Sequence, residues 1–168
     1  QSNQTLKIFG DETNIVKRQR GGIAMTAPFI MLVDDEAPFV ETMAKRLKKR
    51  NIETITAFSG DECLEKLKTN QNLDVIILDV KMPGKDGLET LKDIKAFSPL
   101  IEVIMLTGHA TVESGIKGMK LGAYDFLMKP CDIEELTGKV EEAAKKKKDH
   151  EEKIKEAENK DLLAKFEP

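Results

Sequence analysis

Cysteine is scarce in this sequence of 168 residues, and neither sign of charge is in strong excess. Two cysteines, Cys63 and Cys131, are too few for a disulfide framework, so we interpret them as buried or half-buried thiols in a reducing compartment. The 27 basic and 30 acidic side chains give a net charge of −3, and no region is basic enough to indicate nucleic-acid binding by charge alone.

Long hydrophobic runs are also missing. The longest uncharged run, from Gly21 to Val33, contains a proline and is too short to span a bilayer. It follows three basic residues, as in a signal peptide, but it ends in acidic residues and has no small-residue cleavage site. We therefore expect a cytoplasmic protein with no membrane segment.

The apolar residues that are present, 40% of the total, are enough to bury a core. Short apolar runs alternate five times with amphipathic stretches, at 29–33, 52–57, 74–78, 101–106 and 124–127. Three of these runs are almost wholly apolar, as strands buried on both faces are, and this pattern predicts a parallel sheet covered by helices.

The stretches between the runs have apolar residues at helical spacing. The expected buried stripes are Phe39, Val40, Met43, Ala44 and Leu47; Cys63, Leu64 and Leu67; Leu88, Leu91 and Ile94; Val112, Ile116 and Met119; and Ile133, Leu136, Val140 and Ala144. Helix starts are indicated by pairs at capping-box spacing, namely Ser59 with Glu62, Asp86 with Glu89, and Asp132 with Glu135. Five strand–helix units with right-handed crossovers predict an α/β fold, a doubly wound three-layer sandwich around a five-stranded parallel sheet.

The fold occupies only part of the chain. We expect one domain over residues 25–147, preceded by residues 1–24 as a native extension or an artificial remnant before a natural start at Met25. Residues 148–168 are charged, rich in helix-forming residues and without proline until Pro168, so they are expected to continue the last helix as a solvated tail. A role for this tail in dimerisation or partner docking is the weaker alternative, because its apolar positions are too sparse for a heptad seam.

Polar side chains follow four of the five predicted strands. In a doubly wound sheet these strand ends meet at one cleft. The side chains there are Asp34 and Asp35, Asp79, Thr107, and Lys129. Clustered carboxylates repel, by about 4 kcal/mol for two unit charges ~4 Å apart at an effective dielectric of ~20. A hard divalent cation removes that cost, and oxygen ligands without histidine or cysteine suit Mg²⁺ or Mn²⁺.

The same cluster has the groups that phosphoryl transfer needs. One carboxylate can act as a nucleophile, while Thr107 offers a hydroxyl donor and Lys129 a positive charge for phosphoryl oxygens. Each residue alone has an ordinary structural explanation, such as a helix cap or a turn. Four such residues at four strand ends favour a common site.

Four motifs in order, FIMLVDDE, VIILDVKMPGKDG, VIMLTGHA and AYDFLMKP, resemble the receiver domain of two-component response regulators over roughly residues 28–144. The resemblance implies a flavodoxin-like fold with strand order 2-1-3-4-5. It implies that Asp79 accepts a phosphoryl group from a histidine kinase's phosphohistidine or from a phosphotransfer protein. The domain is then a phosphoacceptor that signals, rather than an enzyme acting on other substrates.

The resemblance also implies roles for individual residues. Asp34, Asp35 and Asp79 hold Mg²⁺ with the main-chain carbonyl of Lys81, while Thr107 and Lys129 bind the phosphoryl group. Pro130 follows a cis peptide bond.

The family further implies a switch, in which Thr107 moves inward and Phe126 rotates into the space beside the fourth strand. The surface formed by the fourth helix, fifth strand and fifth helix then changes, and it is also a candidate homodimer face. The alternative is that Phe126 is simply a packed core residue, and we favour the switch role. Lys81 and His109 are candidates for tuning the lifetime of the phosphoryl group, although His109 can equally be an exposed loop residue.

Other classes of protein fit less well. A haloacid-dehalogenase-type phosphatase needs a second acid two residues after the nucleophile, where this chain has Lys81. A mononucleotide-binding protein needs a phosphate-binding loop after the first strand, where residues 34–36 are acidic. A receiver that docks to partners with little dependence on phosphorylation stays open. So does attachment to a longer regulator, because residues 108–130 resemble receivers attached to AAA+ transcription activators.

Overall fold

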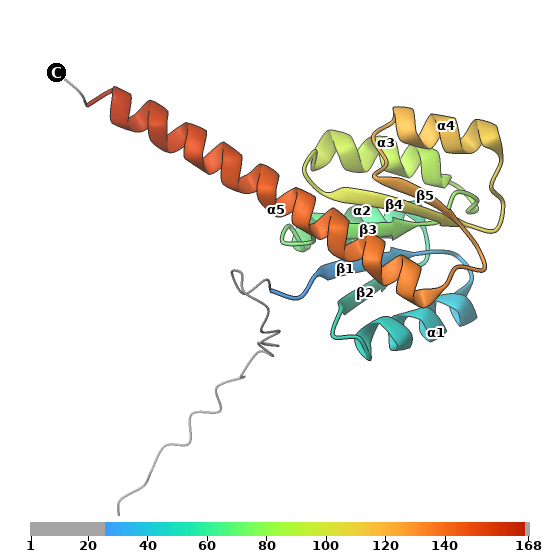
Figure 1. Cartoon of the computed structure of the whole chain (residues 1–168). Coiled ribbons are helices and arrows are strands. Elements are labelled where there is room, and N and C mark those ends of the chain that lie inside the picture. Colours follow the sequence, from blue (N-terminus) through green and yellow to red (C-terminus); the bar gives the residue numbers. More distant parts are fainter. Residues whose placement is uncertain (1–25, 167–168) are drawn as a thin grey trace, which may run out of the picture.

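The five strands form one parallel sheet in the order β2-β1-β3-β4-β5. The computed structural model describes residues 26–166 (Figure 1). The strands are β1 Phe29–Val33, β2 Glu53–Ala57, β3 Val75–Leu78, β4 Glu102–Thr107 and β5 Asp125–Met128. The helices are α1 Ala37–Lys48, α2 Gly60–Thr69, α3 Gly87–Phe97, α4 Val112–Lys120 and α5 Ile133–Ala164. The predicted flavodoxin-like fold and strand order are confirmed, while the expected extension over residues 1–24 lies outside the described residues.

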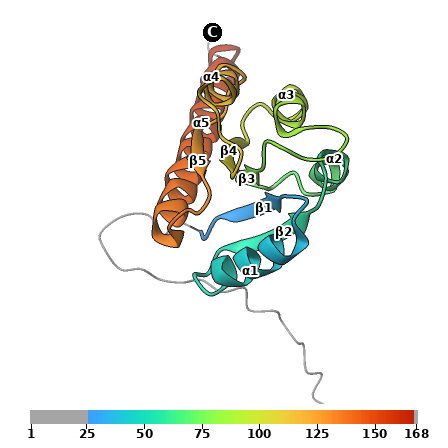
Figure 2. The same ribbon diagram turned by 90° about the vertical axis from the view of Figure 1, so that its right-hand side faces the viewer.

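Alternate side chains of the central strands β1, β3 and β4 build two separate cores. In β1, Ile30 and Leu32 pack in the core that α1 and α5 close, whereas Met31 and Val33 pack in the core that α2 and α3 close. Figure 2 shows α2 and α3 together on one side of the sheet, with α5 on the other. Burial on both faces explains why the strand runs lack polar alternation.

Three of the helices begin at the predicted caps. The side chain of Ser59 accepts a hydrogen bond from the backbone N–H of Glu62, and Asp86 accepts one from Glu89. At α5 the predicted partner is wrong by one residue, because Asp132 caps the N–H of Glu134 at 2.8 Å. The backbone N–H groups of the second and third residues of a helix both lack partners within the helix, so the side chain of a capping aspartate can accept a hydrogen bond from either one.

The predicted buried stripe of α4 is wrong. Val112, Ile116 and Met119 are 83%, 51% and 49% exposed, and α4 instead meets the sheet through Gly118. A β-carbon on Gly118 would lie 3.5 Å from the ring of Phe126, and one on Gly115 would lie 3.9 Å away. Two glycines thus form a flat surface on which the aromatic ring lies, and the larger apolar side chains face outward.

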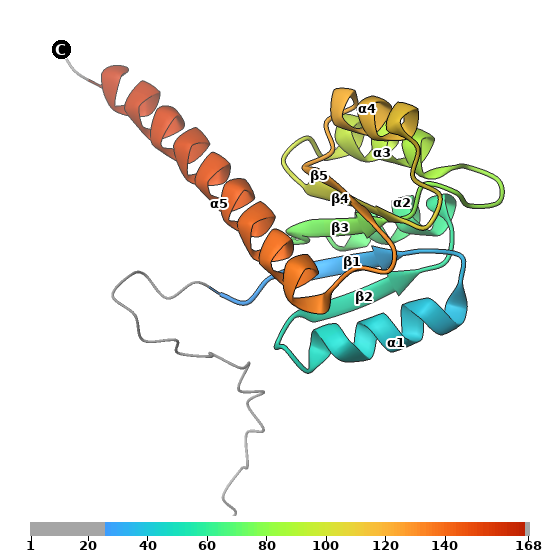
Figure 3. The same cartoon turned by 45° about the vertical axis from the view of Figure 1, so that its right-hand side comes forward.

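The last helix, α5, is 32 residues long and is packed only over its first half. Its last buried residue is Lys147, whose Nζ donates to the carbonyl of Leu73 at 2.6 Å and lies 3.7 Å from Asp74 Oδ1. These partners precede β3, so α5 leaves the domain at the amino edge of the sheet and then projects away (Figure 3). Between residues 26 and 166, no helix is long and apolar enough to cross a bilayer.

Candidate functional site

Polar residues lie at the C-terminal ends of four of the parallel strands, β1, β3, β4 and β5. Val33 is in register with Leu78, so Asp34 and Asp79 leave adjacent strands side by side. Thr107 is in register with Met128, and the backbone N–H of Lys129 donates to the carbonyl of Thr107 at 2.9 Å. Residues far apart in sequence therefore meet here because parallel strands all end at the same edge.

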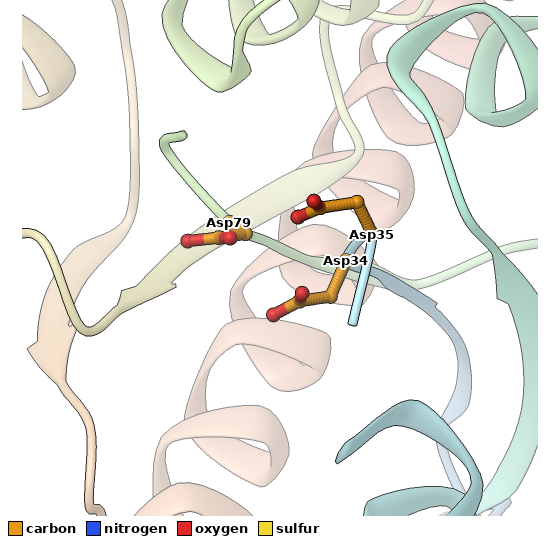
Figure 4. A group of neighbouring side chains, drawn as sticks. All are labelled: Asp34, Asp35 and Asp79. Atoms are coloured by element: carbon orange, nitrogen blue, oxygen red, sulfur yellow. The ribbon is translucent and has the colours of Figure 1, made fainter. Parts of the chain in front are cut away.

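The three aspartates form a compact cluster of oxygen ligands. Asp34, Asp35 and Asp79 each offer a carboxylate oxygen, and these oxygens lie within 4.8 Å of one another (Figure 4). Asp34 and Asp79 are buried, whereas Asp35 is exposed at the mouth of the site. Hard carboxylate ligands with one open side fit Mg²⁺, which commonly keeps several water ligands.

Short backbone contacts orient the two buried carboxylates. Asp34 Oδ1 accepts a hydrogen bond from the N–H of Glu36 at 2.9 Å, and Asp79 Oδ1 accepts one from the N–H of Val80 at 2.9 Å. Each carboxylate therefore has one oxygen fixed by the chain that follows its own strand, which sets the direction of the other oxygen.

Lys129 reaches the cluster from β5. Its Nζ lies 2.5 Å from Asp34 Oδ2 and 3.8 Å from Glu36 Oε1, with the centre of the Phe39 ring 4.0 Å away. The Lys129 side chain is only 15% exposed, so its ion pair with Asp34 is shielded from solvent. The peptide bond between Lys129 and Pro130 is cis.

Burial dominates the ionisation of Asp79. Loss of water raises the pKa of Asp79 above its ordinary value of 3.8, and the nearby Asp34 carboxylate raises it further. The Thr107 hydroxyl, Lys129 and the Val80 N–H lower the pKa and offset part of this rise. A cation bound between the aspartates would favour the ionised form of Asp79 in the same way.

The remaining predicted residues lie around this cluster. Thr107 is fully buried, and its hydroxyl oxygen accepts a hydrogen bond from the N–H of His109 at 3.1 Å. His109 and Lys81 are both exposed, in the loops after β4 and β3. Phe126 is not in the cleft, because its half-buried ring lies beneath α4.

Sequence reasoning missed Gly87, the first residue of α3. A β-carbon there would lie 1.9 Å from the carbonyl oxygen of Asp79 and 2.7 Å from the Cα of Val80. The N–H of Gly87 also donates to the carbonyl of Val80 at 2.7 Å. The sequence did offer a signal, namely a glycine directly after a capping aspartate. The first position of a helix tolerates most side chains, so a glycine there indicates that another backbone segment approaches closely.

Comparison with known proteins identifies one family. The sequence profile of the response regulator receiver domain matches residues 30–141. Transcriptional regulatory protein ZraR of Escherichia coli strain K12 is 35% identical over 114 residues, covering 68% of this chain and 26% of ZraR. DNA-binding transcriptional regulator NtrC of Klebsiella pneumoniae is 36% identical over 112 residues, covering 67% of this chain and 24% of NtrC. The chain thus spans about a quarter of the length of these relatives.

Solved structures agree with the fold. A response regulator receiver domain protein from Clostridium thermocellum superimposes with a TM-score of 0.69 at 35% identity, covering 72% of this chain and 97% of that one. The receiver domain of NtrX from Brucella abortus gives a TM-score of 0.64 at 33% identity, covering 69% of this chain and 98% of that one.

Proposed function

Because this chain belongs to the response regulator receiver family of two-component signal transduction, we propose that Asp79 accepts a phosphoryl group from a phosphohistidine. The donor is a sensor histidine kinase or a phosphotransfer protein. The observation that carries the proposal is the gathering of three aspartate carboxylates at the ends of β1 and β3, with Lys129 paired to Asp34 beside them. Such a domain is a phosphoacceptor for signalling, and we place it in the cytoplasm.

The transfer needs one oxygen of Asp79 as nucleophile. Val80 holds Oδ1, so the other oxygen forms the bond to phosphorus. The bond between phosphorus and the imidazole nitrogen breaks, and its electron pair stays on the histidine. Thr107 donates to the transferred oxygens, and the ammonium of Lys129 balances their charge.

Asp34, Asp35, Asp79 and the main-chain carbonyl of Lys81 would hold Mg²⁺, and Mn²⁺ suits the same oxygen ligands. When bound, the ion neutralises carboxylate repulsion and the charge that develops on the phosphoryl oxygens. The side chains of Lys81 and His109 are exposed in the loops after β3 and β4, so they would shield or admit the water that hydrolyses the acyl phosphate and thereby set how long the phosphoryl group survives.

Phosphorylation would change the surface formed by α4, β5 and α5. It adds about −1.5 to −2 charges beside Thr107. Movement of Thr107 toward the phosphoryl group would open space for Phe126, whose ring lies against Gly115 and Gly118 of α4. Glycines weaken α4 by roughly 0.5–1 kcal/mol each relative to alanine, so a shift of this helix costs little. This surface would contact an output partner or a second copy of the chain.

Labelling with a small phosphodonor tests the proposal. Acetyl phosphate or carbamoyl phosphate should label the wild-type chain when Mg²⁺ is present, and Asp79→Ala should abolish the label. Equal labelling of the two proteins would contradict the assignment.

A second candidate function is docking that does not depend on phosphorylation. It is favoured by the apolar side chains that α4 and β5 already expose, including Val112 at 83% and Met128 at 61%. Binding of a partner by Asp79→Asn separates the two functions, because docking alone survives this substitution and a phosphorylation switch does not.

The output belongs to a longer regulator or to a separate partner. NtrC is a DNA-binding transcriptional regulator by name, and this chain matches only a quarter of it. We propose that these residues act as the regulatory receiver and do not contact nucleic acid themselves.

A further inference from the structure

Three residues of the segment that follows β1 contact the ammonium group of Lys129. Asp34 pairs with it at 2.5 Å, Glu36 lies at 3.8 Å, and the Phe39 ring lies at 4.0 Å from ring centre to Nζ. This segment therefore fixes the position of a side chain that comes from the end of β5, the strand at one edge of the sheet.

Asp34 alone does not fix the position of the Lys129 ammonium well, because its carboxylate has two roles. Its carboxylate belongs to the oxygen cluster that fits a divalent cation, and the same carboxylate pairs with Lys129. Once a cation shares Asp34, less of its charge attracts the ammonium, and the two positive groups repel. Lys129 then needs contacts outside the aspartate cluster to stay beside the cleft.

Phe39 supplies such a contact. The face of an aromatic ring attracts a cation through its quadrupole, and the attraction grows where water is excluded. Phe39 packs against the core beneath α1 and Lys129 is 15% exposed, so both partners are largely shielded from water. Glu36 is 62% exposed, and an ion pair at 3.8 Å on the surface contributes little.

We propose that Phe39 is a positioning residue for Lys129, with its ring face holding the ammonium beside the aspartate cluster independently of Asp34. The proposal rests on the proposed function only for its effect on phosphorylation. The contact itself exists in the free protein and can be measured there. Neither the charge pattern nor the motifs of the sequence assign a task to Phe39.

The NMR signals of the Lys129 methylene next to the ammonium report this contact without metal or phosphodonor. In the wild type we expect an upfield ring-current shift, which Phe39→Leu abolishes and Phe39→Tyr keeps. Asp34→Asn should also keep the shift. An unchanged shift in Phe39→Leu, or its loss in Asp34→Asn, would overturn the proposal.

Phosphorylation gives the second readout. With acetyl phosphate and Mg²⁺, Phe39→Leu should label about 2- to 5-fold more slowly than the wild type, and Phe39→Tyr should restore the rate. Tyr124→Leu is the matched control, because Tyr124 packs on the same core and has Lys146 5.5 Å from its ring centre, away from the cleft. Labelling of Phe39→Leu at the wild-type rate would refute the role of Phe39 in positioning Lys129. Failure of the wild type to label would refute the proposed function, and the NMR shift alone would then decide the positioning of Lys129.

Discussion

Replacing Gly87 by alanine should damage the site more than the fold. The new β-carbon would lie 1.9 Å from the carbonyl oxygen of Asp79, and that oxygen belongs to the backbone and cannot rotate away. An ordinary contact needs at least about 3.4 Å, so the chain at Asp79 and Val80 must move by more than about 1 Å. Overpacking of this kind costs typically ~1–3 kcal/mol of stability.

The effect on phosphorylation should be larger than the effect on stability. A displacement of about 1 Å in a reacting group can lower a rate by on the order of 100-fold. We therefore expect Gly87→Ala to reduce the rate of labelling by acetyl phosphate by about that factor, while urea titration still shows a folded protein.

Gly60→Ala is the matched control, because Gly60 also begins a helix and is also buried. Its new β-carbon would lie 2.2 Å from the side-chain oxygen of Thr90, so the variant strains the contact between α2 and α3 and not the backbone of Asp79. It should lose stability but keep most of its labelling rate. Equal labelling rates for Gly87→Ala and the wild type would refute the positioning role of Gly87.

Four further predictions concern packing and ionisation. Burial raises the pKa of the Cys63 thiol to about 12, so a disulfide reagent should modify half-buried Cys131 first, and Cys63 only on unfolding. The folded pKa of Cys63 lies above the ordinary value of 9.0, so the neutral thiol stabilises the fold below pH 9 and this contribution is lost as pH rises toward 12. The unfolding free energy, measured by urea titration, should therefore fall less steeply between pH 9 and 12 in Cys63→Ala than in the wild type. Lys147→Ala removes the donor of a buried carbonyl and should cost about 1–3 kcal/mol in unfolding free energy, whereas Lys148→Ala, which loses only solvent-exposed hydrogen bonds to Thr26, should stay within ~0.5 kcal/mol. Val112→Ser should leave the thermal midpoint nearly unchanged, because this side chain is 83% exposed; a drop of several degrees would show that α4 packs through it.

Strands and cleft residues could be predicted because burial on both faces leaves a direct pattern in the sequence. The observed strands begin and end within one residue of the apolar runs. Parallel strands end at one edge, so the meeting of Asp34, Asp79 and Lys129 followed from topology alone.

Features that depend on the absence of a side chain could not be predicted in this way. Periodicity correctly placed Val112, Ile116 and Met119 on one face of α4 but gave no direction for that face, and the glycine face packed instead. The contact between Phe39 and Lys129 joins two distant segments, and its geometry depends on how the first turn of α1 meets the residue that follows β5.

Mapping the phosphorylated residue tests the central claim most directly. The chain is incubated with acetyl phosphate, with and without chelation of Mg²⁺, and the acyl phosphate is located in peptides by mass spectrometry. Our account predicts a single modified residue, Asp79, and no modification after chelation. A label on another residue, or one at Asp79 that forms equally well without divalent cation, would contradict it.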